Sequence, residues 1–413
     1  MHTPHPPKQL LPLGEREFIA MLAFCQALQA LAIDAMLPAL GNIAQDLGST
    51  DPNQRQLIVG VFLLGIGLGS LVPGSISDRF GRKPVLLACF AVYVLTSLVG
   101  AMSQSFTALL VLRFVQALGA GGLAVMPMAI IRDRFQGDQM ARIQSLIGAI
   151  FLVVPMLAPS LGQLVLLFAG WRWIFGLMAL LGAIMTAWVA LRLPETLHAE
   201  FRQPIRISAI TRNMAAALTT RASIGYLLGS SLILGAIWGY IQSSQQLVSE
   251  HFGAGTAFPL VFGGMALFMA VASFTNSRIV ERFGARRVSH TALVAYLLVG
   301  IAHVTLAWGN ETLWQFVPVM TAAMCLMGFI AANFQSIALH PFARFAGAAS
   351  SAQAFLRLAA GAIFGAILGQ SYDGTARPLA YAILGGGIGS LLLVLYSEKG
   401  RLFGHPRPSG SGT

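Results

Sequence analysis

Long apolar runs alternate with short polar connections along almost the whole chain. Each run has about 20 residues or more, which is the length that an α-helix needs to cross a bilayer. A longer polar connection, residues 193–222, divides the runs into two sets of six. The pattern predicts transmembrane helices near residues 17–40, 56–77, 84–103, 106–131, 143–168, 171–192, 223–247, 257–278, 288–308, 315–339, 346–370 and 379–397.

The composition also indicates a membrane-spanning fold. Of the 413 residues, 56% are hydrophobic and only 10% are charged, whereas about 25% of the residues of an ordinary soluble domain are charged. We therefore predict an all-α integral membrane protein of twelve transmembrane helices. Its expected parts are a cytoplasmic tail (1–16), a six-helix bundle (17–192), a cytoplasmic linker (193–222), a second six-helix bundle (223–397) and a cytoplasmic tail (398–413).

Basic residues are distributed unevenly over the two predicted sides of the membrane. Of the 26 Lys and Arg residues, 21 lie on the side of the N-terminus, three lie on the other side (Arg55, Arg172, Arg377) and two lie inside predicted helices (Arg113, Arg357). Cytoplasmic loops of membrane proteins carry an excess of Lys and Arg, so this asymmetry predicts that both termini are cytoplasmic. It also explains the formal charge of +11 without a nucleic-acid partner.

The residue types that enzymes need are sparse. Cys25, Cys89 and Cys325 fall within predicted helices and have neither a pairing pattern nor a metal-ligand spacing. The histidines are scattered, and only one carboxylate, Asp34, is predicted to be buried. The sequence therefore predicts no enzyme, no metal site and no cofactor.

Two connections share a sequence pattern. Asp78-Arg-Phe-Gly81 follows the second predicted helix, and Glu281-Arg-Phe-Gly284 follows the eighth, 203 residues later. That offset is about half the chain and carries the first six helices onto the last six, which predicts a tandem duplication of a six-helix unit. Each unit has an even number of spans, so both have the same orientation in the membrane.

Three motifs resemble those of the major facilitator superfamily. The loop from Gly74 to Lys83 resembles the signature between its helices two and three. Leu112–Gly119 in helix four resembles its buried-Arg motif, and Pro155–Gly162 in helix five resembles its antiporter motif. The resemblance implies two six-helix bundles that rock about a central cavity lined by helices one, four, seven and ten. It implies no cofactor, because the proton gradient drives the transport.

Further segments resemble the bicyclomycin and chloramphenicol resistance (Bcr/CflA) branch of drug:proton antiporters, namely Ile33–Leu40, Gly170–Phe175, Leu193–Thr196, Ala349–Ser351 and Phe355–Arg357. The resemblance implies proton-coupled efflux of small-molecule drugs across the bacterial inner membrane by a monomeric, multi-pass carrier. In the helix-five motif, however, Val154, Ala158 and Gln163 replace the usual glycines. Proton-coupled uptake of a small nutrient or metabolite therefore stays open as the alternative.

Asp34 is the acidic residue predicted to lie well inside a span. An ionised carboxylate in hydrocarbon costs several kcal/mol, so it needs a partner or a wet cavity. Counted from the predicted helix ends, Asp34 and Arg113 both lie near 10 Å below the outer surface, at about 1.5 Å per residue. We expect them to face each other and Asp34 to carry the proton. The alternative is a fixed ion pair that orients helices one and four.

Arg357 is predicted to lie near the middle of helix eleven without a second buried acid to neutralise it. Two arginines and one aspartate would give the cavity a net charge of about +1, which favours neutral, polar or anionic drugs over strictly cationic ones. Alternatively, Arg357 bonds to carbonyl groups or to Gln353 and serves helix packing. The other candidates for substrate contact are polar or aromatic residues that could instead bridge helices: Gln26, Gln29, Gln116, Trp238, Tyr240, Gln242 and Asn333.

The loop after helix two is interpreted as a conformational latch made by Gly74, Asp78, Arg79, Gly81 and Arg82. Asp78 would meet the positive N-terminal end of helix eleven when the inner gate is shut. Gly74 would allow close helix approach and Gly81 the turn. The alternative is a basic loop that only sets the topology.

Helix five contains Pro155, Pro159 and Gly162. The two prolines free backbone carbonyl groups and bend the helix, which predicts either a hinge or a simple kink.

Overall fold

The protein is all-helical and matches the predicted order of spans. The computed structural model describes residues 13–403 except 50, 52, 136, 198–199, 201–214 and 216–218. Within these ranges eleven helical spans are long and apolar enough to cross a membrane, and a further long helix, α13, has a shorter apolar stretch. The elements are α1 (Glu15–Asp34), η1 (Leu37–Ala39), α2 (Leu40–Asp46), η2 (Gln54–Gln56), α3 (Leu57–Phe80), α4 (Arg82–Ala101), α5 (Phe106–Arg134), α6 (Gly137–Phe168), α7 (Arg172–Arg192), α9 (Arg221–Gln245), η4 (Gln246–His251), η5 (Gly255–Ala257), α10 (Phe258–Phe283), α11 (Ala285–Ala307), α12 (Leu313–Leu339), η6 (His340–Phe345), α13 (Ala346–Gln370) and α14 (Arg377–Ser397).

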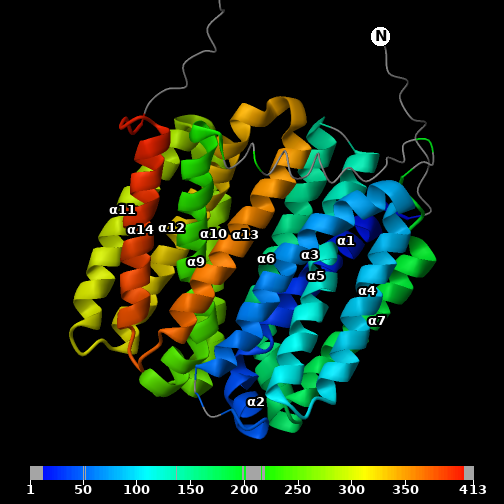
Figure 1. Ribbon diagram of the computed structural model, residues 1–413, viewed down its shortest axis with the longest axis horizontal. Helices are drawn as coiled ribbons and strands as arrows, with labels where there is room; N and C mark the ends of the chain where they lie inside the picture. The colour runs from blue at the N-terminus through cyan, green and yellow to red at the C-terminus, as the bar shows by residue number, and fades with distance from the viewer. Residues whose placement is uncertain are drawn as a thin grey trace, which may run out of the picture.

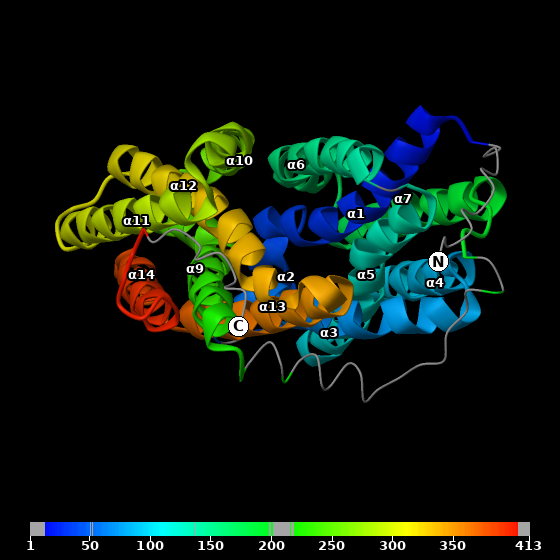
Figure 2. The same cartoon turned by 90° about the horizontal axis from the view of Figure 1, so that it is seen from above.

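The helices form two groups that lie side by side (Figure 1). Helices α1 to α7 make the first half of the molecule and α9 to α14 the second. The start of α1 and the end of α14 lie at the same end, here named the terminal end, and α2 lies at the opposite end. Seen from above, α6 and α10 adjoin on one side of the contact between the halves and α3 and α13 on the other (Figure 2). Much of the predicted linker, 193–222, and parts of both predicted tails lie outside the described residues.

Large apolar side chains cover the outer faces of the helices. Phe168, Leu191 and Trp314 are each more than 80% exposed. In water such residues would form aggregation-prone patches, whereas in a bilayer they face hydrocarbon chains. The exposed surface therefore fits the membrane environment that the apolar runs predict.

The first predicted helix, 17–40, is interrupted. α1 ends at Asp34, a short 3-10 turn contains Pro38, and α2 then continues the span to Asp46. A proline ring clashes with the carbonyl group four residues earlier, so Pro38 opposes a regular helix through Asp34. The buried acid thus lies at a break in its helix, and the span extends further beyond it than predicted.

The duplicated loops adopt the same backbone conformation. Gly81 has φ 103° and ψ 157°, and Gly284 has φ 80° and ψ 150°. Positive φ values are accessible to glycine at low cost because it lacks a Cβ atom. The predicted turn at Gly81 is therefore confirmed, and its repeat at Gly284 makes the same turn in the second half.

Candidate functional site

A central cavity of about 200 Å³ lies between the two halves. Helices α1, α3 and α6 line it from the first half, and α9, α10, α12 and α13 line it from the second. Apolar side chains predominate in the lining, which includes Trp238, Phe262, Met269, Met324 and Met327. Pockets for drug-sized ligands usually measure about 300–1,000 Å³, so larger ligands require the halves to move apart.

Among the described residues that line this cavity, Asp34 is the one with an ionisable side chain. It is only 5% exposed, it lies at the last residue of α1, and it shares the cavity with residues of the second half. Gln29 lies on the same helix and adds one polar group to the lining. A carboxylate in such apolar surroundings is costly when charged and much less so when protonated. The charge of Asp34 therefore depends strongly on what else occupies the cavity.

Arg113 does not pair with Asp34, and this expectation is wrong. Its guanidinium group is completely buried within the first half, where it donates to the carbonyl of Ala32 (2.9 Å) and to the side chain of Gln116 (2.7 Å). It also lies 3.9 Å from the ring centroid of Phe62. The sequence predicts equal depths for the two residues, but depth does not determine the direction in which a side chain points. Arg113 holds α1, α3 and α5 together, while Asp34 faces the other way.

Arg357 also lies outside the lining of the central cavity, although its neighbour Leu358 belongs to it. The guanidinium group donates to Gln335 on α12 (3.1 Å), and its Nε atom has no hydrogen-bond partner. Gln353 bonds instead to Ser223 and to the carbonyl of Ala338. The predicted net positive charge of the cavity is therefore wrong, because neither arginine contributes to it and Asp34 does.

The remaining cavity candidates divide into two groups. Gln29 and Trp238 line the cavity. The others are absent from its lining and mostly make contacts within one half: Gln26 donates to the carbonyl of Ala124, Gln116 bridges Arg113 and Ser97, Tyr240 contacts Met265, Asn333 donates to Asn276, and Gln242 is buried at the contact with α3. Several of these polar side chains thus bridge helices, as the alternative to substrate contact predicts.

The antiporter-like motif of the fifth predicted helix lies in α6 and packs beside Asp34. Pro155 lines the cavity, and Pro159 is buried one turn further along α6. A Cβ atom added to Gly162 would overlap the carbonyl oxygen of Ala35, the residue after Asp34. Gly162 therefore allows α6 to approach the break in the first span, in the way that small residues permit close helix packing in membranes.

The predicted latch residues form a charged network within the first half. Arg82 is 2% exposed, and its guanidinium group lies 2.7 Å from Asp78 and 2.8 Å from Asp133. Glu195 accepts hydrogen bonds from the backbone N–H groups of Arg82 and Lys83. The sequence does not predict Asp133 as a site residue, because no local pattern links it to Arg82, 51 residues earlier.

Two other predicted latch residues make weaker contacts. Arg79 lies over the ring of Phe80, 5.3 Å from its centroid. A Cβ atom added to Gly74 would meet nothing within 4 Å, so close helix approach at Gly74 is not observed. The contact between Asp78 and the start of α13 stays a prediction for a different state of the protein.

The halves are joined by polar contacts at the end opposite the termini. The guanidinium group of Arg55 binds both carboxylate oxygens of Glu250 at 2.7 Å. Asn53 donates to the carbonyl of Tyr372 (2.8 Å), and Gln370 donates to the carbonyl of Asn53 (2.8 Å). Among the described residues, every side-chain hydrogen bond or ion pair between the halves involves residues 53–56. These contacts close the cavity at that end.

Glu311 is a second buried carboxylate, which corrects the expectation that only Asp34 is buried. It lies in the connection between α11 and α12, its side chain is 2% exposed, and Oε1 lies 3.6 Å from Nε2 of His303. Both carboxylate oxygens lack a hydrogen-bond partner. Burial raises the pKa of Glu311 to about 7. No sequence pattern predicts this burial, because a polar loop residue is normally solvated.

The raised pKa of Glu311 predicts a pH-dependent stability. Between its usual pKa of 4.5 and about 7, the folded protein holds the proton and the unfolded chain does not. Glu311 should therefore lower the stability as the pH rises through this range, by at most about 3 kcal/mol. In thermal unfolding at pH 5 to 8, the wild type should lose stability relative to Glu311→Gln as the pH rises, and this comparison isolates the contribution of Glu311. Exposed Glu281→Gln is the control, and the same pH dependence in Glu311→Gln as in the wild type would contradict the assignment.

The observations define a class of protein. Two packed groups of apolar helices enclose a cavity at their contact, polar contacts close it at one end, and one acid lines it. This is the arrangement of a membrane transporter built from two repeats, with the substrate site at the repeat interface.

The family follows from comparisons with known proteins. The model of the Major Facilitator Superfamily matches residues 22–366, and this chain belongs to that family. It is 30% identical to a bicyclomycin resistance protein homolog of Haemophilus influenzae over 89% of this chain and 92% of that one. It is 31% identical to the multidrug resistance protein MdtL of Klebsiella pneumoniae over 77% of this chain and 80% of that one. The predicted resemblance is thereby confirmed.

Solved structures share the fold. A bacterial homolog of the human lysosomal transporter Spinster, in an inward-facing and occupied conformation, superposes with a TM-score of 0.69 at 15% identity and covers 92% of this chain and 96% of its own. The xylose transporter XylE of E. coli gives a TM-score of 0.70 at 11% identity, covering 93% and 97%.

Proposed function

We propose that this protein exports small lipophilic drugs across the bacterial inner membrane in exchange for protons. The observation that carries the proposal is Asp34, which is the one ionisable side chain that the described part of the chain contributes to the lining of a cavity shared by both halves. Gain or loss of one charge there changes the energy of each cavity state by several kcal/mol. The names of the related proteins, bicyclomycin resistance homolog and multidrug resistance protein, support drugs as the substrate class.

The lining of the cavity indicates what kind of drug it accepts. Apart from Asp34 and Gln29, the described side chains of the lining are apolar. Met269, Met324 and Met327 are flexible and can adapt to different shapes. Neutral lipophilic compounds fit this surface when Asp34 is protonated, and lipophilic cations fit it when Asp34 is ionised. This substrate class replaces the preference for neutral or anionic drugs that the charge count had favoured.

Proton exchange follows from competition at Asp34. When the cavity opens to the outside, the acid takes up a proton, and a bound cationic drug leaves because its counter-charge is gone. When the cavity opens to the cytoplasm, the acid releases the proton and the next cationic drug molecule binds. A ligand shifts an equilibrium between two states only by its difference in affinity for them, and the charge of Asp34 provides that difference.

The two ends of the molecule provide the gates in this scheme. The Arg55–Glu250 pair closes the end opposite the termini in the present structure. With both termini in the cytoplasm, that closed end faces outward and the cavity serves the inner side. The network of Asp78 and Arg82 would contact the start of α13 when the inner side closes, so closure would alternate between the two ends.

Everted membrane vesicles with an acidified lumen test the direction of transport. Drug added outside should enter the lumen in exchange for protons and dissipate the pH gradient reported by a fluorescent probe. The compounds to use are bicyclomycin, chloramphenicol and the lipophilic cation tetraphenylphosphonium. Vesicles without the protein are the control.

Uptake by proton symport is the alternative, and the same vesicles distinguish it. A symporter would leave the gradient intact when substrate is added outside and would dissipate it only when substrate is preloaded in the lumen. That result would overturn export. A drug flux with no proton movement would overturn the antiport.

A further inference from the structure

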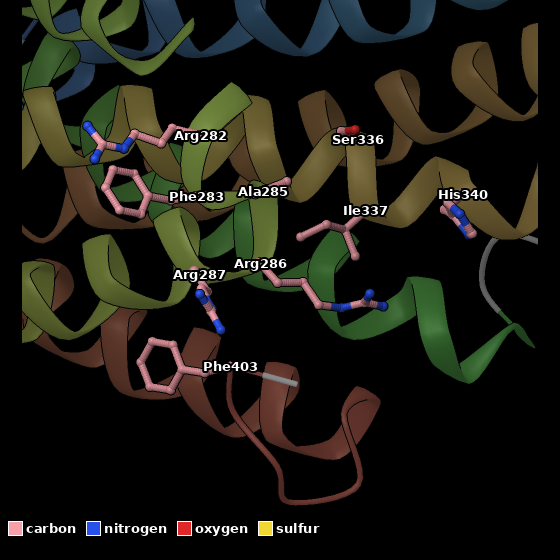
Figure 3. Close-up of a pocket in the computed structure, with 10 residues that line it drawn as sticks. Arg282, Phe283, Ala285, Arg286, Arg287, Ser336, Ile337, His340 and Phe403 are labelled. Carbon is pink, nitrogen blue, oxygen red and sulfur yellow. The ribbon is translucent and has the colours of Figure 1, made fainter. Parts of the chain in front are cut away.

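A basic pocket of about 440 Å³ lies at the terminal end of the second half, outside the transport cavity. It is formed by the α10–α11 turn, the end of α12 and Phe403, and Figure 3 shows these side chains. Arg282, Arg286, Arg287 and His340 line it, and none of the described lining residues is a carboxylate. Glu398, nearby, binds Arg286 through Nε (2.9 Å) and leaves the other guanidinium groups to the pocket.

The duplication explains why this space exists. In the first half the guanidinium group of Arg82, paired with Asp133, fills the corresponding position. The residues 203 positions later are Ala285 and Ser336, and both line the basic pocket. Two small side chains thus stand where the first half has an ion pair. The second half keeps the loop and its basic residues and lacks the groups that would fill the space.

An apolar groove of about 540 Å³ continues from the basic pocket. Phe283, Arg287 and Phe403 belong to both. The groove follows α11 from Val288 to Ala295, which is about 10 Å along the helix axis. Its other walls are apolar residues of α10 and α12. A cationic pocket at the helix ends therefore joins an apolar channel that runs toward the middle of the membrane.

We propose that this joined surface binds an anionic phospholipid, with its phosphate in the basic pocket and an acyl chain in the groove. Arg forms paired hydrogen bonds with phosphate oxygens, and basic pockets between transmembrane helices bind anionic lipid head groups. The lack of a lining carboxylate disfavours the choline or ethanolamine group of a zwitterionic lipid. A free phosphate would use the pocket and leave the groove empty, so the groove selects the lipid.

Lipid binding to the purified full-length protein tests the proposal, measured by native mass spectrometry in detergent. Phosphatidylglycerol should bind more tightly than phosphatidylcholine with the same acyl chains. The double variant Arg282→Gln with Arg287→Gln should weaken phosphatidylglycerol binding about 30-fold, because each Arg near an anionic lipid contributes about 5-fold. Arg278→Gln, an exposed arginine of α10 outside the pocket lining, is the matched control and should bind as the wild type does.

Two further variants address the shape of the site. Thr291→Trp adds a bulky side chain at an exposed position of the groove, and should weaken lipid binding about 10-fold, the effect of excluding roughly two CH₂ groups. The pair Ala285→Arg with Ser336→Asp rebuilds the ion pair of the first half, fills the pocket, and should also reduce binding.

The outcomes separate the lipid from other ligands. Equal binding of the two lipids, or unchanged phosphatidylglycerol binding in the double arginine variant, would overturn the proposal. Competition by inorganic phosphate together with no effect of Thr291→Trp would assign the pocket to a free anion instead. Weaker phosphatidylglycerol binding in all three pocket and groove variants, with unchanged binding in Arg278→Gln, would support the lipid site.

Discussion

Asp34→Asn is expected to reduce proton-driven drug efflux roughly 100-fold. A charge at this depth in the membrane costs about 2.5–3.5 kcal/mol, and the variant loses this energy difference between the charged and the protonated state. The asparagine has nearly the same size, keeps a polar group in the cavity and cannot ionise. Efflux from cells or proteoliposomes should therefore lose its dependence on the pH gradient. Binding of neutral drugs, measured by fluorescence on the purified protein, should persist.

Asp34→Glu is the matched control for this prediction. It keeps a titratable carboxyl group in the same cavity and should retain a substantial part of the pH-driven efflux. If Asp34→Asn transports drugs at the wild-type rate and still responds to the pH gradient, Asp34 has no part in the coupling. The wild-type and variant proteins should elute identically in size-exclusion chromatography, since the acid makes no ion pair with Arg113 whose loss would unfold the bundle.

Gly162→Ala is expected to have the second-largest effect, on both stability and transport. Its new Cβ atom would overlap the backbone carbonyl of Ala35, so α6 or the break after Asp34 has to move. Overpacking a tight contact costs about 1–3 kcal/mol. We expect a lower thermal unfolding temperature and about a tenfold or larger loss of efflux, because each 1.4 kcal/mol corresponds to a factor of ten.

Gly148→Ala provides the control on the same helix. A Cβ atom at Gly148 would meet nothing within 4 Å, and alanine favours the helical state by about 1 kcal/mol relative to glycine. This variant should be as stable as the wild type or slightly more stable, with unchanged efflux. Equal unfolding temperatures and equal efflux of the two variants would show that the contact between Gly162 and Ala35 contributes neither to stability nor to transport.

The sequence predicts some side-chain positions correctly and others wrongly. The buried acid Asp34 and the turn at Gly81 are predicted correctly, because burial in a span and a repeated Gly follow from local composition. The pairing of Asp34 with Arg113 and the place of Arg357 in the cavity are predicted wrongly. Helix depth follows from counting residues along one segment, whereas the direction of a side chain depends on how that segment is rotated against its neighbours.

The sequence by itself determined the helical spans, their number and the duplication of the six-helix unit. This holds because hydrocarbon leaves a chain few options: every backbone hydrogen bond must be made within the segment, so apolar length predicts a helix. Only the tertiary structure decided which residues share the cavity, that Arg82 meets Asp133, that Glu311 is buried, and that Ala285 and Ser336 leave a basic pocket open. These contacts join residues far apart in the chain, and interhelical packing rather than any local pattern brings them together.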